Sequence, residues 1–222
     1  MRLSLNRFYE FLARPLPLGA RFALVVLAVP LALSFMQPLW RISMFAPQYP
    51  AGLQLDIYAY TVDGGNGGAD LQEINTLNHY IGMRTLDREA MSDLDWIPFA
   101  LGGLVLFTFR VAAIGNVSAL IDLVVTTAYV GLFAFARFVY TLYVFGHNLR
   151  PDAPVKMPGF MPVVVGSKQI ANFTTHSWPQ LGSLLLGTFV VGLLVTLVII
   201  LVQGRRAALA LEDELRTPAH AE

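Results

Sequence analysis

The sequence contains no cysteine, and only 14% of its 222 residues are charged. The absence of cysteine excludes disulfides, covalently attached c-type haem, iron–sulfur clusters and thiolate-bound metals. A soluble domain usually carries about 25% charged residues. The shortfall, with a mean hydropathy of +0.58, indicates a chain whose solvent is largely lipid. Lysine plus arginine equals aspartate plus glutamate at 15 each, which gives no indication of nucleic acid binding.

Several catalytic and cofactor motifs are also missing from the sequence. It has no P-loop, nucleophile elbow, HExxH motif or dinucleotide fingerprint, so we expect no nucleotide, no flavin and no enzyme acting alone. No histidine falls in the middle of a long apolar segment, which makes a bilayer haem with two axial histidines unexpected.

Long apolar segments predict four transmembrane helices, over residues 22–40, 97–114, 117–145 and 181–203. A helix needs about 20 apolar residues to cross a hydrocarbon core of roughly 30 Å. The first segment follows an arginine-bearing stretch, but LALSFMQPLW offers no convincing small-x-small cleavage site, so we interpret it as a retained anchor. The predicted fold class is a mostly α integral membrane protein.

Basic residues are concentrated near the two ends of the chain. Residues 1–21 contain four arginines, and residues 204–222 contain Arg205 and Arg206 near their start, whereas residues 41–95 hold three arginines against eight acidic residues. Cytoplasmic flanks of membrane helices are enriched in lysine and arginine. We therefore expect both termini in the cytoplasm and the 41–96 and 146–180 segments on the outer face.

The two outer segments predict a small α+β cap. Residues 53–62 alternate apolar and polar as in a half-buried strand, DGGNGG predicts a tight turn, and ADLQEINTLNHYIG predicts a short helix. Asp70 is expected to cap the start of that helix and Gly82 to end it. Five prolines and three glycines between residues 146 and 180 predict irregular structure there. Residues 1–21 predict a cytoplasmic amphipathic helix ended by prolines.

Two charges flank the predicted turn between the second and third membrane helices. Arg110 lies five residues before Gly115, and Asp122 lies seven residues after it. Equal depth predicts an ion pair near the inner interface, with a proton or ion path as the alternative.

A third charge, Arg137, lies in the long predicted helix over residues 117–145. Tyr140 and Tyr143 resemble an outer aromatic belt, so Arg137 is expected to snorkel outward from one turn below it. The alternative is contact with an anion or a quinone headgroup.

Imidazole and thioether groups gather in the predicted cap. Together they form a ligand set suited to copper, particularly Cu(I). His79 and Met83 are four residues apart at a helix end and can project toward one point. The ligand set predicted from this pattern is His79, Met83, His147 and His176. The alternative is a folded cap whose histidines bond to the backbone.

Four stretches resemble a family of small bacterial membrane proteins that are encoded beside nitrous oxide reductase and its copper-maturation factors. They are FAPQYPAGL (45–53), EINTLNHYIGM (73–83), FGHNLRPDAPVKMPGFMP (145–162) and GSKQIANF (166–173). The resemblance implies a bacterial inner-membrane protein with its cap in the periplasm. It also implies a role in nitrous oxide respiration, either copper delivery to the reductase or electron supply and anchoring for it. Copper is then the candidate cofactor, and the reductase, its copper-maturation factors or its electron donors are the candidate partners. Residues expected to contact a partner or support the site are Asn75, Asn78, Tyr80, Asn148, Lys168 and Asn172.

Three functions remain open from the sequence. The first is an accessory protein that binds copper or docks a copper-handling or redox partner at the outer face. The second is a metal-free anchor or structural subunit of a respiratory membrane complex. The third is a quinol-linked electron-transfer component, for which the sequence offers no redox-cofactor signature.

Overall fold

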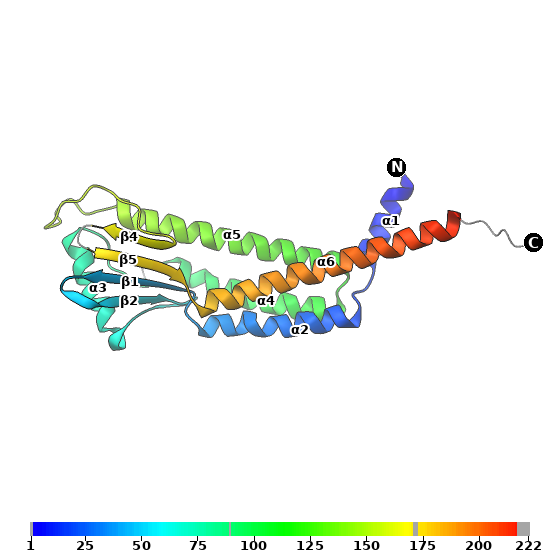
Figure 1. Cartoon of the computed structure of the whole chain (residues 1–222), viewed down its shortest axis with the longest axis horizontal. Coiled ribbons are helices and arrows are strands. Elements are labelled where there is room, and N and C mark those ends of the chain that lie inside the picture. Colours follow the sequence, from blue (N-terminus) through cyan, green and yellow to red (C-terminus); the bar gives the residue numbers. More distant parts are fainter. Residues whose placement is uncertain (1, 89, 171–172, 217–222) are drawn as a thin grey trace, which may run out of the picture.

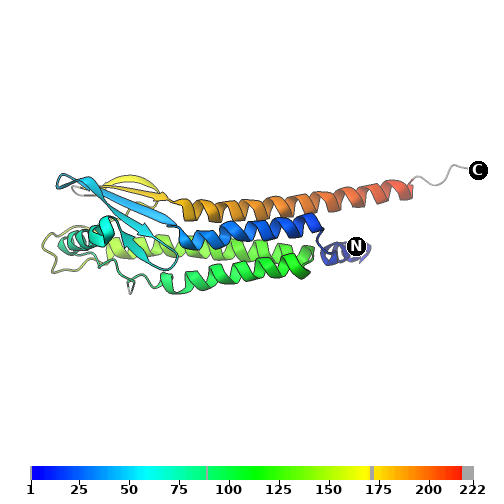
Figure 2. The same cartoon turned by 90° about the horizontal axis from the view of Figure 1, so that it is seen from below.

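The computed structural model describes residues 2–88, 90–170 and 173–216. A bundle of long helices carries a small β-sheet and a short helix at one end (Figures 1 and 2). The bundle consists of α2 (Leu18–Leu33), α4 (Asp93–Ile114), α5 (Val117–His147) and α6 (Leu181–Arg216). The short N-terminal helix α1 (Arg2–Ala13) and the far end of α6 lie at the opposite end of the bundle from the sheet (Figure 1).

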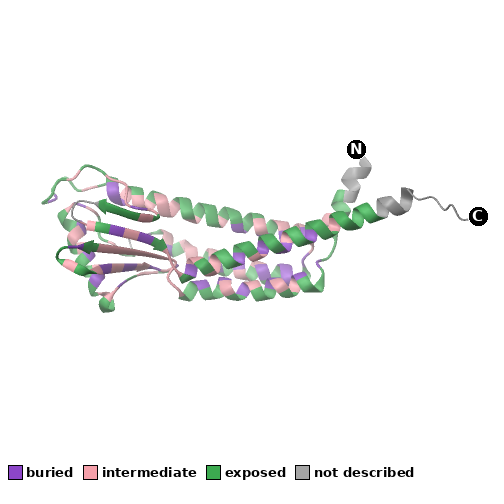
Figure 3. Ribbon diagram, in the orientation of Figure 1, coloured by how far each residue is buried: buried purple, intermediate pink, exposed green. Residues whose placement is uncertain are grey.

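Three of these helices, α4, α5 and α6, are long and apolar enough to cross a membrane. Their outward surfaces are largely exposed (Figure 3), and large apolar side chains such as Phe99, Leu106 and Tyr129 are more than two-thirds exposed. Apolar surface of this extent is typical of a lipid-facing protein. The chain therefore has the character of a membrane protein.

The first predicted span differs from the structure. Helix α2 has 16 residues, a 3₁₀ turn follows over Ser34–Met36, and strand β1 already begins at Trp40. By length and composition α2 is a shorter apolar helix than the other three. The expectation of a helix through residue 40 is wrong because the chain pairs with the sheet before it reaches that position. The other spans also begin or end outside the predicted limits, at Asp93, His147 and Arg216.

The bundle core lies between α2, α4, α5 and α6. Helix α2 packs against α4 and α6, and α4 packs against α5. Apolar residues at helical spacing face inward, as Leu24 and Leu31 do from α2, and they meet Leu104, Leu120 and Phe189 from the other helices. Burial of one face of each helix against the others, with the remaining surface apolar, is the arrangement that a lipid solvent favours.

The cap contains a five-stranded antiparallel sheet in the order β3-β2-β1-β5-β4. The strands are β1 (Trp40–Ala46), β2 (Tyr49–Ile57), β3 (Val62–Gly64), β4 (Gly166–Ile170) and β5 (Phe173–Pro179). Strands β1 and β5 pair along most of their length, from Trp40 opposite Pro179 to Phe45 opposite Thr174. This pairing joins the two segments that the sequence assigns to one cap.

The second cap segment is more regular than its composition predicts. The prolines concentrate in residues 151–162, which form no helix or strand, whereas β4 and β5 follow over residues 166–170 and 173–179. The prediction of irregular structure throughout 146–180 is therefore wrong for its second half. Pro179 is tolerated because it is the last residue of its strand.

The short helix α3 (Ala69–Tyr80) ends as predicted and begins differently. The N–H of Gly82 donates to the carbonyl of His79, and the N–H of Met83 donates to that of Asn78, with Gly82 at φ +79°. This is a Schellman stop that needs a left-handed residue. At the start, the expected cap by Asp70 is wrong: its buried carboxylate accepts instead from the backbone N–H of Gln54 at 2.9 Å, tying α3 to β2.

The charges in the long helices are also arranged differently from the prediction. Arg110 and Asp122 are both exposed on the helix surface, and within the described ranges no ion pair joins them. Their neighbours Val111 and Leu123 are the residues that face the core, so both charges point away from it. Arg137 forms an ion pair with Asp93 of α4, with an N–O distance of 2.8 Å, which neither interpretation of the sequence expected.

Candidate functional site in the cap

The two faces of the sheet have different chemistry. Ile42, Met44, Leu55 and Ile57 point toward α3 and the end of α5, where they form one wall of an apolar cavity. The opposite face carries an ion pair between Arg41 and Asp56, which are register partners in β1 and β2, and also the exposed ring of Trp178. The hydrogen bond from Arg41 to Asp56 raises the pKa of the guanidinium. Arg41 is therefore charged, and the ion pair lies on the face of the sheet away from the cavity.

Helix α3 is held against the sheet by polar contacts at its first two turns. Tyr49 of β2 donates to the Glu73 carboxylate, and this hydrogen bond raises the pKa of the Tyr49 phenol. With the contact of Asp70 to β2, these bonds turn the face that contains Ile74 and Asn78 inward. The two residues are four apart, so they lie on the same side of the helix.

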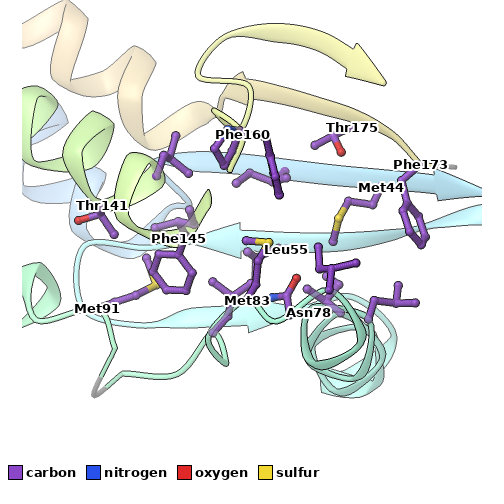
Figure 4. Close-up of a pocket in the computed structure, with 18 of the residues that line it drawn as sticks. Met44, Leu55, Asn78, Met83, Met91, Thr141, Phe145, Phe160, Phe173 and Thr175 are labelled. Atoms are coloured by element: carbon purple, nitrogen blue, oxygen red, sulfur yellow. The ribbon is translucent and has the colours of Figure 1, made fainter. Parts of the chain in front are cut away.

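The cavity between the sheet, α3 and the cap end of α5 has a volume of about 110 Å³. Figure 4 shows its walls, with Met44, Met83 and Met91 spread along it rather than converging on one point. Phe138, Thr141, Leu142 and Phe145 of α5 line it on the bundle side, and Phe160 and Pro162 come from the irregular loop. The lining is almost wholly apolar.

Asn78 is the one amide among the residues that line this cavity, and Thr141 and Thr175 are the other polar ones. The residue is 6% exposed, and its Nδ2 has no hydrogen-bond partner among the described residues. Figure 4 places it beside Met83 and Leu55. Buried amide groups are nearly always hydrogen-bonded, because an unsatisfied donor costs about 1–3 kcal/mol. An unpaired donor at a cavity therefore needs an explanation.

An open polar cleft of about 350 Å³ lies next to the cavity, and Met83 lines both. The cleft is also lined by His79, Arg84, Thr85, Asp87, Ala90 and Arg150. Arg150 reaches it because its backbone N–H donates to the carbonyl of Gly82 at 2.8 Å. The structure thus brings His79 and Met83 to one place, as their spacing predicts, and adds an arginine from the second segment.

The Nη2 group of Arg150 hydrogen-bonds to Nδ1 of His79. An arginine side chain can only donate, so Nδ1 of His79 must accept and the ring proton resides on Nε2. In this arrangement neither ring nitrogen offers a free lone pair. A metal ion can take His79 only after Arg150 moves.

Asn75 holds the loop that forms the floor of the cleft. Its side chain accepts from the N–H of Leu86 at 2.6 Å and donates to the carbonyl of the same residue at 3.2 Å. This two-point contact is a structural role, as one of the two sequence interpretations expected.

The other predicted ligands lie outside the cleft. His147, at the end of α5, bonds through Nδ1 to the carbonyl of Tyr143 at 3.0 Å and stacks on its ring. His176 bonds to Ser167 on the neighbouring strand and meets the ring of Phe45. The adjacent residue Thr175 lines the cavity. Since side chains alternate along a strand, His176 projects from the opposite face of the sheet.

The remaining predicted residues have separate positions. Tyr80 and Asn148 are exposed at the ends of α3 and α5, and Lys168 donates to the carbonyl of Met161 at 2.8 Å. Asn172 lies outside the described residues. Sequence reasoning did not identify Arg150 as part of the site, nor the cavity role of Met44 and Met91. A loop arginine and two methionines at unrelated spacings carry no signal for it.

Within the described part of the chain, no three or more His, Asp or Glu side chains lie close enough to hold a metal ion together. Thioether sulfurs can also be metal ligands, and Met83 supplies one beside His79. Two donors from one helix end fit a low-coordinate Cu(I) ion better than a metal that needs four ligands. No protein-family model, curated protein or solved structure matches the chain.

Proposed function

We propose that this chain is an accessory membrane protein that serves a periplasmic copper enzyme of nitrous oxide respiration. Its cap binds copper, or docks a copper-handling or redox partner, at the outer face of the bacterial inner membrane. The resemblance of four cap stretches to a family encoded beside nitrous oxide reductase supports the setting. The cap itself supplies binding surfaces rather than a pair of catalytic groups, which supports a binding role.

The proposed topology places both termini in the cytoplasm and makes α2 a fourth crossing. The 16 residues of α2 extend about 24 Å, and the 3₁₀ turn adds about 6 Å. Together they approach the roughly 30 Å of a hydrocarbon core. The position of α1 and the end of α6 away from the cap (Figure 1) supports this arrangement, as does the arginine content of residues 1–21 and 204–222.

The observation that carries the copper proposal is the shared cleft of His79 and Met83. Both side chains line an open, solvent-accessible hollow, and they supply a nitrogen and a soft sulfur donor. Copper would supply a soft Lewis acid to be passed to a partner, and the two residues would hold it. Arg150 then opposes copper binding. While it donates to Nδ1 of His79, Nε2 carries the ring proton, so neither nitrogen has a free lone pair, and the positive charge of Arg150 repels a cation.

The test is a competition titration with a coloured Cu(I) chelator on the detergent-purified chain. Wild type should bind Cu(I), and His79→Ala and Met83→Leu should bind it more weakly. Arg150→Ala should bind Cu(I) more tightly than wild type, because Nδ1 of His79 is then free and the opposing positive charge is removed. The matched control is His176→Ala, which removes an imidazole from the other face of the sheet and should leave binding unchanged. Absence of Cu(I) binding in both wild type and Arg150→Ala would overturn the copper proposal.

The second candidate is a metal-free anchor or structural subunit of a respiratory membrane complex, whose cap contacts a partner, and the His79–Arg150 contact favours it. Arg84 and Arg150 both line the cleft, with Asp87 as the acidic residue among its lining. This function predicts that no variant binds Cu(I), and that charge reversal of Arg84 lowers co-purification of the reductase or its maturation factors. The two candidates therefore separate on the same set of proteins.

A further inference from the structure

The apolar cavity of the cap adjoins the polar cleft of the proposed copper site and shares Met83 with it, but copper binding does not require the cavity. It combines three properties that point to a ligand: a volume of about 110 Å³, walls of methionine and phenylalanine, and one unpaired amide donor. We propose that this cavity binds the ring of a membrane quinone, with Nδ2 of Asn78 donating to one of the ring carbonyls.

The unpaired amide of Asn78 is the feature that calls for a polar ligand. A leucine at this position would fill the same side of α3 without burying an unsatisfied N–H, so the amide is costly unless something pairs with it. Among the described residues nothing does. A carbonyl oxygen of a ligand seated in the cavity supplies the missing acceptor, and a neutral acceptor suits a site whose lining contains no charged side chain.

The walls favour a flat, polarizable ring over a saturated chain. Met44, Met83 and Met91 provide thioethers, which make favourable contacts with π systems and adjust their rotamers to an irregular occupant. Phe145, Phe160 and Phe173 add aromatic faces and edges. The cavity of about 110 Å³ is smaller than the apolar hollow of about 150 Å³ that accepts benzene in other proteins, so the flexible methionines must move aside to admit a substituted ring.

The cavity lies at the cap end of α5, beside residues typical of a membrane interface. Its bundle-side wall is the cap end of α5, where Phe138 and Leu142 alternate with the exposed rings of Tyr140 and Tyr143. Exposed tyrosines near a helix end are typical of the membrane–water interface. The isoprenoid tail of a quinone can therefore remain in the bilayer while its ring occupies the cavity.

The proposal concerns binding and extends the function proposed above without depending on copper. The probe is decylubiquinone, a short-chain quinone, added to the full chain in detergent while tryptophan fluorescence is recorded. Trp40 is a suitable reporter because its ring packs at 5.1 Å on Phe138, which lines the cavity. Saturable quenching is expected for wild type, and Asn78→Leu should weaken it about tenfold, the value of one hydrogen bond.

Two variants and two further probes complete the test. Leu77→Phe adds volume to the cavity wall and should abolish saturable binding. Gln72→Leu also replaces an amide with leucine on α3, but at an exposed position outside the cavity, and should bind as wild type. Decylbenzene lacks carbonyls and should bind wild type and Asn78→Leu equally. Methyl oleate represents a lipid ester. Tighter binding of methyl oleate than of decylubiquinone would assign the cavity to lipid and overturn the proposal, as would equal quinone affinity in wild type and Asn78→Leu.

The copper and quinone proposals can be tested independently of each other. Asn78→Leu should keep whatever Cu(I) affinity the wild type has, because Asn78 does not line the cleft. Leu77→Phe is distinguished from a folding defect by its thermal unfolding, since an added ring that the cavity accepts leaves the cooperative transition in place.

Discussion

Arg137 of α5 and Asp93 of α4 join the two helices at the cap end of the bundle. The Nε and Nη2 groups of Arg137 lie 2.8 and 3.3 Å from the two carboxylate oxygens of Asp93. Thr141 and Trp96 also donate to this carboxylate. A two-point contact of this kind has fixed geometry as well as charge, so it sets where the end of α5 stands beneath the cavity.

This pair yields a ranking of variant stabilities. Asp93→Asn leaves Arg137 without its carboxylate, and Arg137→Leu leaves Asp93 without its cation, whereas the double variant with leucine at both positions leaves neither charge unpaired. Because an unpaired charge is costlier than an absent pair, we expect both single variants to unfold at lower temperature than the double variant. Thermal unfolding in one detergent measures the order. A double variant less stable than either single one would mean that the pair itself supplies the stability.

Gly82 links the two cap segments. It holds a left-handed conformation, and a side chain there would place its Cβ 2.9 Å from both Cβ of Ala153 and the carbonyl oxygen of Arg150. Gly82→Ala should therefore cost more than the roughly 1–2 kcal/mol of a left-handed alanine and loosen residues 148–155 from α3. Denaturant unfolding gives the cost, and limited proteolysis of that loop gives the loosening.

The matched control is Gly67→Ala, which has φ +66° and open space around its Cβ position. It carries the backbone strain without the clash. The difference between the two variants isolates the contact with the second segment, and equal losses would show that this contact contributes nothing.

Much of this architecture could be predicted from local sequence. Helix α3 and its glycine stop follow from a pattern within fourteen residues, and the long apolar runs identify α4, α5 and α6. Strand β5 could not be predicted this way, because its partner β1 lies more than a hundred residues earlier in the chain, and β4 pairs with β5 alone. Their register decides which side chains reach the cavity, and no local rule sets it.

Some contacts of the site likewise follow from local sequence, and others do not. His79 and Met83 share a cleft because the left-handed turn at Gly82 brings the backbone of Met83 back to the carbonyl of Asn78, which is a local property. The Arg150 contact spans 71 positions and the Arg137–Asp93 contact spans 44, so neither follows from spacing. His176 illustrates the limit, since a shift of one residue in β5 would have turned it to the cavity side.

Asn75 should be important for the cleft without touching a ligand. Asn75→Ala removes both hydrogen bonds to the backbone of Leu86, leaving a partly buried N–H and carbonyl to find water. A loss of roughly 1–3 kcal/mol of unfolding free energy is expected, with faster amide exchange over residues 84–88. Thr76→Ala is the control, because its hydroxyl bonds only to its own helix, at Gln72. Unchanged exchange in Asn75→Ala would mean that the loop is held by its apolar contacts instead.

The proposed topology can be tested in cells because the chain has no cysteine of its own. Single cysteines at Ala13, Lys156 and Ala208, which are exposed in the structure, report on α1, the cap and the inner end of α6 respectively. An impermeant thiol reagent should label intact spheroplasts only at Lys156→Cys, and all three positions after detergent is added. The reason is the arginine content of residues 1–21 and 204–222, which favours the cytoplasmic side.

Two other labelling patterns would contradict this topology. Labelling of Ala13→Cys together with Lys156→Cys would mean that α2 does not cross the bilayer. Labelling of Ala13→Cys and Ala208→Cys without Lys156→Cys would mean that the whole protein has the opposite orientation. The second result would place the cleft and cavity in the cytoplasm and remove the basis for a periplasmic copper role.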